Sequence, residues 1–242
     1  MKTLHNQPGG TASQQSQETA LDGTRFLPVI TGLFVGVLLL SNILAAKMVQ
    51  IGPFIFDGGT LLFPLSYIFG DILTEVYGYR QSRKVIWTGL VMLILMSLNI
   101  TIIGLLPAEE SWALQNAYDS LLSQVPRIVL ASIIAYFAGE YSNSVILSRM
   151  KVLTKGKYLW TRTIGSTLVG QLADTVLFVA IAFGGLYATA SLIIMALSNY
   201  LFKTVIEIVC TPATYAAVGF LKKTEDIDVY DYNEHYNPLP LD

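Results

Sequence analysis

Residues 26–46 read FLPVITGLFVGVLLLSNILAA, an apolar stretch without a single charged side chain. A helix of about 20 residues crosses the hydrocarbon core of a bilayer, so this stretch is long enough to span it. The whole chain of 242 residues has the same character, because 53% of its residues are hydrophobic and only 13% are charged, whereas soluble domains carry about 25% charged residues. The composition therefore predicts an integral membrane protein and excludes an intrinsically disordered chain.

Five more apolar runs of sufficient length follow along the chain. They are Thr60–Tyr79, Val85–Leu106, Arg127–Ser148, Thr163–Gly184 and Leu186–Leu221. The last is about twice as long as a span needs to be. We interpret it as a short lead-in and one kinked span over residues 192–221; the alternative is two spans, seven in total. The runs are continuous rather than alternating, which favours helices over a β-barrel. The prediction is an all-α integral membrane protein with a six-helix transmembrane bundle.

Lysine and arginine residues gather on one side of the six predicted spans. That side carries Lys2, Arg25, Arg80, Arg83, Lys84, Arg149, Lys151, Lys155, Lys157, Arg162, Lys222 and Lys223, whereas the other carries only Lys47 and Arg127. Cytoplasmic loops of membrane proteins have such an excess of positive side chains. Both termini are therefore predicted to be cytoplasmic, as an even number of spans also requires.

Two polar tails flank the apolar region. Residues 1–24 lack the short apolar stretch of a signal peptide and predict a flexible polar tail. Residues 223–242 are acidic and rich in tyrosine, and predict a solvated C-terminal tail. The six-span transmembrane domain then covers residues 25–222.

Several kinds of site are not expected. Both histidines, His5 and His235, lie in the tails and Cys210 is the only cysteine, so we predict neither a metal site nor a cofactor. A formal net charge of −2 leaves no basic footprint for a nucleic acid. Gly32 and Gly36 have the spacing of a close helix contact, which is weak support for a homodimer within the lipid bilayer.

Five acids and one lysine fall inside the predicted spans. They are Asp71, Glu75, Glu140, Asp174, Glu207 and Lys203. A charge at the centre of a bilayer costs on the order of 3 kcal/mol even on the lenient insertion scale. We therefore expect these side chains to face an interior cavity rather than lipid.

Helical spacing gives each of these spans one polar stripe, because residues three or four apart share a face. The stripes can converge on one pocket, and they define the candidate substrate-binding residues. These are Asn42, Tyr67, Asp71, Glu75, Glu140, Asn143, Gln171, Asp174, Phe178, Lys203 and Glu207. A carboxylate accepts two parallel N–H bonds, and aromatic faces stack on planar rings. The set favours a planar, donor-rich heterocycle as the small-molecule substrate.

Simpler structural roles are open for four of these charges. Lys203 and Glu207 are four residues apart and can neutralise each other on one helix. Asp71 and Glu75 can extend from the end of their span toward the membrane interface. Asp174 lies well inside an apolar run and is the hardest to explain without a function.

One segment is specific enough to indicate a family. Phe63–Trp87 reads FPLSYIFGDILTEVYGYRQSRKVIW, and it is accompanied by SNILAAK at Ser41–Lys47 and QLADTVLF at Gln171–Phe178. With these strings the chain resembles the queuosine precursor transporter family, which is placed among small membrane proteins similar to vitamin uptake transporters. The resemblance covers about residues 26–222.

The resemblance implies a non-enzymatic, six-span inner-membrane protein that imports 7-cyano-7-deazaguanine, 7-aminomethyl-7-deazaguanine and, as a third option, queuine. Our hypothesis for the site is that Asp174 and Glu75 accept from the N1–H and 2-amino edge. Asn42, Gln171 and Asn143 would bond the 6-oxo group or ring nitrogens, Tyr67 or Phe178 would stack on the ring, and Lys203 would donate to the 6-oxo group or pair with an acid.

Three alternative functions are also compatible with the sequence. One is a carrier or substrate-capturing subunit for another vitamin or purine-like solute. A second is an intramembrane aspartyl protease that uses two acids such as Asp71 and Asp174. A third is a cation channel lined by acids. The chain has no GxxxxGK[ST] motif, so an ATP-driven process would need a partner protein.

Overall fold

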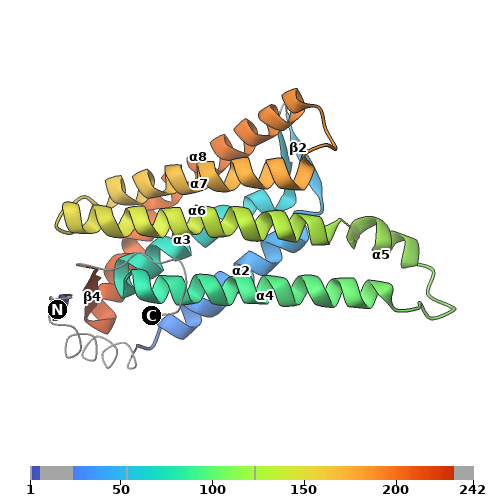
Figure 1. Ribbon diagram of the computed structural model, residues 1–242. Helices are drawn as coiled ribbons and strands as arrows, with labels where there is room; N and C mark the ends of the chain where they lie inside the picture. The colour runs from blue at the N-terminus through green and yellow to red at the C-terminus, as the bar shows by residue number, and fades with distance from the viewer. Residues whose placement is uncertain (1, 6–23, 53, 123, 232–242) are drawn as a thin grey trace.

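The computed structural model describes residues 2–5, 24–52, 54–122 and 124–231, and Figure 1 shows their arrangement. Six helices that alternate in direction make up an elongated bundle (Figure 1). They are α2 (Leu27–Leu44), α3 (Phe63–Ile72), α4 (Tyr79–Leu105), α6 (Val125–Leu153), α7 (Leu159–Phe183) and α8 (Thr189–Glu225). The smaller elements are β1 (Lys2–His5), β2 (Met48–Ile51), β3 (Phe54–Asp57), η1 (Gly58–Leu61), η2 (Leu73–Tyr77), α5 (Gln115–Leu122) and β4 (Ile227–Tyr230). The prediction of an all-α bundle is confirmed.

Within the described residues, five helical stretches are long and apolar enough to cross a membrane, and α3 differs from them. The second predicted span, Thr60–Tyr79, contains ten residues of α-helix and the five-residue π-helical segment η2. Fifteen helical residues rise about 22 Å, which is shorter than a hydrocarbon core of about 30 Å. Gly78, at a φ of +84°, ends η2 in a conformation that glycine adopts without strain. This short segment packs between the other helices, so it does not need the length of a lipid-exposed span.

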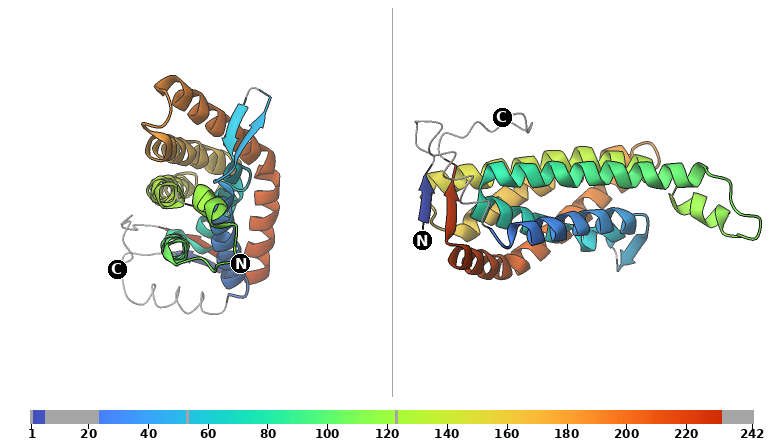
Figure 2. Two further views of the ribbon diagram at one scale, coloured as in Figure 1. Left: turned by 90° about the vertical axis from the view of Figure 1, so that its right-hand side faces the viewer. Right: turned by 90° about the horizontal axis from the view of Figure 1, so that it is seen from below.

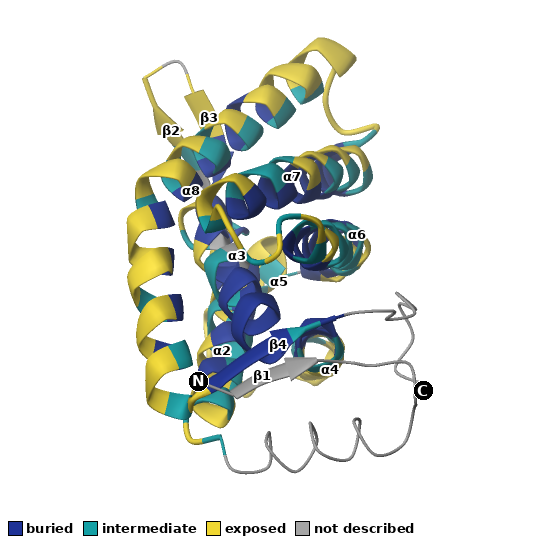
Figure 3. Ribbon diagram, turned by 90° about the vertical axis from the view of Figure 1, so that its left-hand side faces the viewer, coloured by how far each residue is buried: buried dark blue, intermediate teal, exposed yellow. Residues whose placement is uncertain are grey.

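The last apolar run is one continuous helix. α8 has 37 residues and contains Pro212, and Figure 3 shows that it bends around the side of the bundle. Proline removes one backbone hydrogen bond and commonly bends a helix. The helix begins before and ends after the predicted span of residues 192–221, and no turn divides it into two spans.

The outer faces of the helices are apolar. Leu98, Ile102, Val209 and Phe220 are each more than half exposed, and Figure 3 shows exposed residues along the outer side of α8. Buried serine, threonine, amide and charged side chains lie between the helices instead. Apolar side chains such as Phe34 and Leu38 share this interior, and the combination of exposed apolar faces with buried polar groups suits a protein whose solvent is lipid.

The hairpin β2–β3 returns the chain to the end of α2. Figure 2 shows the hairpin and the β1–β4 pair at opposite ends of the bundle. A Cβ atom on Gly58 would lie 2.5 Å from the carbonyl oxygen of Leu44, and one on Gly59 would lie closer still to that of Ser41. Only glycine permits this approach. Gly58 and Gly59 lie between the first two predicted spans, and the structure buries both of them against α2.

The start of the expected C-terminal tail is packed onto the bundle. Helix α8 extends to Glu225, and β4 pairs in parallel with β1. Ile227, Asp228 and Val229 are buried. Residues 223–231 therefore differ from the solvated tail that their acidic composition predicts, because the apolar residues of β4 cover the bundle end. The remainder of that tail and most of the predicted N-terminal tail lie outside the described residues.

Candidate functional site

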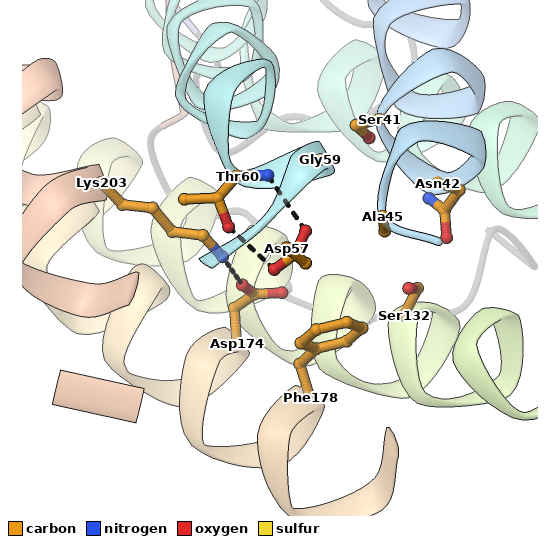
Figure 4. Close-up of a pocket in the computed structure, with 10 residues that line it drawn as sticks. All are labelled: Ser41, Asn42, Ala45, Asp57, Gly59, Thr60, Ser132, Asp174, Phe178 and Lys203. Carbon is orange, nitrogen blue, oxygen red and sulfur yellow. Dashed lines mark hydrogen bonds and ion pairs between the residues drawn. The ribbon is translucent and has the colours of Figure 1, made fainter. Parts of the chain in front are cut away.

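A small cavity lies between the end of α2, the β3–η1 segment and helices α6, α7 and α8 (Figure 4). Its lining consists of Ser41, Asn42, Ala45, Asp57, Gly59, Thr60, Ser132, Asp174, Phe178 and Lys203. The volume of the cavity is about 20 Å³, which is room for about one water molecule. The structure therefore holds this site closed to any larger ligand.

An ion pair between two helices borders the cavity. Lys203 Nζ on α8 donates to Asp174 Oδ2 on α7 at 2.9 Å, and both side chains are at least 95% buried. Sequence reasoning left open that Lys203 pairs with Glu207 on its own helix, whereas the structure shows an ion pair with Asp174. A buried carboxylate held by one movable ammonium group can exchange that partner for a ligand donor of similar strength.

Asp57 is a second carboxylate at the cavity. Its Oδ1 accepts from Thr60 N at 3.1 Å and its Oδ2 accepts from Thr60 Oγ1 at 2.8 Å, so it caps η1. Asp57 also lies within electrostatic range of Asp174, and Figure 4 shows the two side chains beside each other. Sequence reasoning missed both Asp57 and Thr60. The signal was the string Asp-Gly-Gly-Thr, since an aspartate three residues before a threonine is a typical helix cap.

An amide and an aromatic ring complete the cavity wall. Asn42 Nδ2 donates to Leu38 O at 3.0 Å, which leaves Asn42 Oδ1 without a hydrogen-bond partner among the described residues. Phe178 presents its ring on the opposite side, next to Ser132 (Figure 4). The cavity thus combines acceptors, one ammonium donor and an aromatic face.

A second group of candidate residues lies buried between α3, α6 and α8. Asp71 Oδ1 accepts from Asn143 Nδ2 at 2.9 Å. Glu140 packs against the backbone at Gly70, where a larger residue would collide with its carboxylate. Asp71 lies within electrostatic range of Glu140 and Glu207. We call Asp71, Glu140 and Glu207 the central acids.

Gln171 and Tyr67 are the remaining two candidate residues. Gln171 is fully buried and its Oε1 accepts from Thr204 Oγ1 at 3.4 Å. It lies one helical turn before Asp174 on α7. Tyr67 lies on α3, and its side chain is outside the part of the structure that is described.

Glu75 belongs to a third group, at the end of the bundle that carries β4. Its Oε2 accepts from Arg162 at 2.5 Å and its Oε1 accepts from Lys222 at 2.7 Å. Lys151 lies 3.7 Å from Glu75 and donates to Asp228 at 2.8 Å. We call these five residues the end cluster. Because its oxygens are occupied, Glu75 is not placed to share a ligand edge with Asp174 in this conformation.

Asp231 anchors the chain beside the end cluster. Both of its carboxylate oxygens accept from the backbone N–H of Tyr79, and one also accepts from Ser148 Oγ at 2.7 Å. Burial raises the pKa of Asp231, and these hydrogen bonds oppose that shift. The contact fixes the start of α4 to the segment after β4.

The structure thus divides the candidate residues into three groups. Asn42, Asp174, Phe178 and Lys203 meet at the cavity, the central acids lie with Asn143, and Glu75 lies in the end cluster. Asp71 and Glu75 are each 1% exposed, so neither side chain extends into solvent. Asp71 accepts from Asn143 and Asp174 pairs with Lys203, so these two carboxylates have separate partners.

Comparisons with known proteins identify the family. The sequence model described as "Putative vitamin uptake transporter" matches residues 57–217, from the end of β3 through most of α8. The chain belongs to this family. Family membership confirms the resemblance found in the sequence, and makes the chain a membrane transporter rather than an enzyme.

Three curated relatives are similar to the chain over most of their length. The "Probable queuosine precursor transporter" of Bacillus subtilis (strain 168) is 27% identical over 80% of this chain and 86% of the relative. The "Queuosine precursor transporter" of Escherichia coli (strain K12) is 28% identical over 70% of this chain and 75% of the relative. The "Probable queuosine precursor transporter" of Haemophilus influenzae is 26% identical over 66% of this chain and 67% of the relative. No solved structure matches the chain significantly.

Proposed function

We propose that this protein imports queuosine precursors, 7-cyano-7-deazaguanine and 7-aminomethyl-7-deazaguanine among them, with queuine as a third candidate. The observation that carries the proposal is the small cavity in which Asp174, Asn42 and Phe178 converge from different helices. The names of the three relatives support the substrate class.

Each group at the cavity suits one part of a deazaguanine base. Asp174 accepts from the N1–H and 2-amino edge, which offers two parallel donors. Lys203, released from Asp174, donates to the 6-oxo group. Phe178 stacks on the bicyclic ring, and Asp57, rather than Glu75, is the second carboxylate within reach. The cationic aminomethyl group of one candidate substrate is compatible with this excess of acids.

Transport requires the site to open, because pockets for drug-sized ligands measure about 300–1,000 Å³ and this one admits about one water. We therefore infer alternating access, in which the closed state alternates with states open to either side. The α7–α8 ion pair and the β3–η1 segment are the contacts that an incoming base would have to separate.

We further propose six membrane crossings in the inner membrane, with both termini in the cytoplasm. The start of α2 and the end of α8 lie at the same end of the bundle as the α6–α7 turn (Figure 1), and that turn carries Lys155 and Lys157. A homodimer stays a prediction, and Gly32 and Gly36 face open space on α2, where a second copy could pack.

The test is growth and tRNA queuosine content in a strain that cannot make the precursor, supplied with nanomolar precursor. We expect queuosine to be restored by the wild-type chain and not by Asp174→Asn. Asp119→Asn, an exposed change in α5, is the matched control and should behave as wild type. Normal queuosine in the Asp174→Asn strain at equal membrane abundance would contradict the assigned role of Asp174.

A second candidate function is uptake of another vitamin or purine-like solute, which the family description favours. Competition decides between the two. If an unlabelled vitamin or purine displaces labelled 7-deazaguanine at lower concentration than 7-deazaguanine itself, the second function holds.

A further inference from the structure

The central acids have no positive partner among the described residues. Asp71 on α3 is 1% exposed, Glu140 on α6 is 0% exposed and Glu207 on α8 is 1% exposed. The buried cations nearby are committed elsewhere, since Lys203 pairs with Asp174 and Arg162 pairs with Glu75. Three carboxylates thus share an interior in which no described ammonium or guanidinium group is paired with them.

Several oxygens of these carboxyl groups also have no hydrogen-bond donor among the described residues. Neither oxygen of Glu140 has a hydrogen-bond donor in the described part of the chain, and Asp71 Oδ2 has none either. Asn143 Oδ1 and Gln171 Nε2 are also buried without a partner there. The hydroxyl of Thr167 lies beside Glu207. Unpartnered atoms on several helices indicate a site that holds something small.

A proton suits this geometry best. Ionised carboxylates in a membrane interior lose their hydration, and neighbouring negative charges repel one another, so protonation is the simplest relief. A multivalent metal ion does not fit, because the described residues contain no group of three His, Cys, Asp or Glu side chains arranged to hold one. A protonated carboxyl group also becomes a donor, which can satisfy a neighbouring acceptor such as Asn143 Oδ1.

Resting on the proposed function, we propose that Asp71, Glu140 and Glu207 form a proton-binding site that couples substrate import to proton entry. The titratable and charged groups that face this site from the surrounding elements are Tyr136 on α6, Glu75 on η2, Asp174 on α7 and Lys203 on α8.

Glu140 links the proton site to the substrate cavity. Its carboxyl group lies within electrostatic range of Asp174 and of Glu207. A proton on Glu140 removes a negative charge near Asp174, which lets Asp174 stay ionised when Lys203 leaves it for the substrate. By thermodynamic linkage, substrate on Asp174 then tightens the binding of the proton. The proton enters from the outer side and leaves to the cytoplasm with the substrate.

The first experiment tests the site without any substrate. Infrared spectroscopy of the purified full chain at neutral pH should show the C=O stretch of protonated carboxyl groups that are buried and protected from hydrogen exchange with solvent. Glu140→Gln and Asp71→Asn should each remove part of this band, and Glu109→Gln, in an exposed loop, should not. A wild-type spectrum without the band would overturn the proton site, whatever transport measurements give.

The second experiment tests coupling. Proteoliposomes take up labelled 7-cyano-7-deazaguanine with and without an imposed pH gradient. One proton per substrate predicts about tenfold higher accumulation for a gradient of one pH unit, acid outside, and Glu140→Gln and Glu207→Gln should abolish this response. Saturable wild-type uptake that ignores the gradient would overturn the coupling and leave the transport function intact. Absence of wild-type uptake with or without the gradient would overturn both.

Discussion

The end cluster and the central acids are two groups of buried charges with opposite arrangements. In the end cluster, Glu75 accepts from Arg162 and Lys222, and Asp228 accepts from Lys151 and Lys222. The central acids have no positive partner among the described residues. Pairing makes a buried charge structural, because each partner depends on the other, whereas an unpaired acid is free to change its charge. Acidic side chains as close in sequence as Asp71 and Glu75 therefore differ in whether a cation neutralises them.

Removing a partner from the end cluster should give the largest effect. Glu75→Gln leaves Arg162 and Lys222 without their carboxylate, and breaking such a buried pair costs about 3–5 kcal/mol. We expect a large loss in the free energy of unfolding, measured by thermal or denaturant unfolding in detergent. Glu110→Gln, in an exposed loop, is the control and should unfold as wild type does. Equal stability of both variants would show that the end cluster is not structural.

The next largest effect concerns the cavity. Asp174→Asn keeps the size of the side chain but removes its charge, and a hydrogen bond to a charged group contributes about 1.5–3 kcal/mol. We expect the affinity for 7-deazaguanine to fall about ten- to a hundredfold, together with a loss of stability because Lys203 loses its buried carboxylate partner. Binding to detergent-purified protein measures this directly, and unchanged affinity would remove Asp174 from the site.

Asp57 allows stability and binding to be separated. Asp57→Ala removes the cap of η1 and should lower stability by about 1 kcal/mol. Asp57→Asn keeps an acceptor for Thr60 and should keep most of that stability, yet lose substrate affinity severalfold. If Asp57→Asn binds substrate as wild type does, Asp57 acts only as a cap.

Phe178 tests the stacking contact. Aromatic stacking contributes about 0.5–1.5 kcal/mol beyond the buried area, so Phe178→Leu should weaken binding about two- to tenfold. Phe220→Leu, on the exposed face of α8, is the matched control. Both variants are compared by the Kd of 7-cyano-7-deazaguanine, and equal values would place the ring of the base elsewhere.

The smallest effect completes the comparison with Glu75. Glu140→Gln replaces an unpaired carboxyl group with a neutral group of nearly the same size, so the unfolding free energy should change by less than about 1.5 kcal/mol. Unfolding measured beside Glu75→Gln provides the check. A loss as large as that of Glu75→Gln would mean that Glu140 has a structural partner.

The sequence predicted the composition of the site better than its grouping. Helical spacing correctly placed Asp174 and Phe178 on one face of α7, because that spacing is local. It could not indicate that Lys203 reaches Asp174 on another helix, or that Lys222 reaches Glu75 from 147 positions away. Asp57 was missed because a hairpin returns it to α2, and nothing in an apolar pattern marks such a return.

The sequence by itself determined a helical membrane protein, its family and the buried polar side chains that make it unusual. Hydrophobicity, helical periodicity and local strings decide these properties, since each depends on residues close together in the chain. Only the tertiary structure decided which acids are neutralised by cations, that α3 is short and enclosed, and that Asp57 borders the cavity. Those outcomes depend on the packing of distant helices, which sets the distance between charges and therefore their energy.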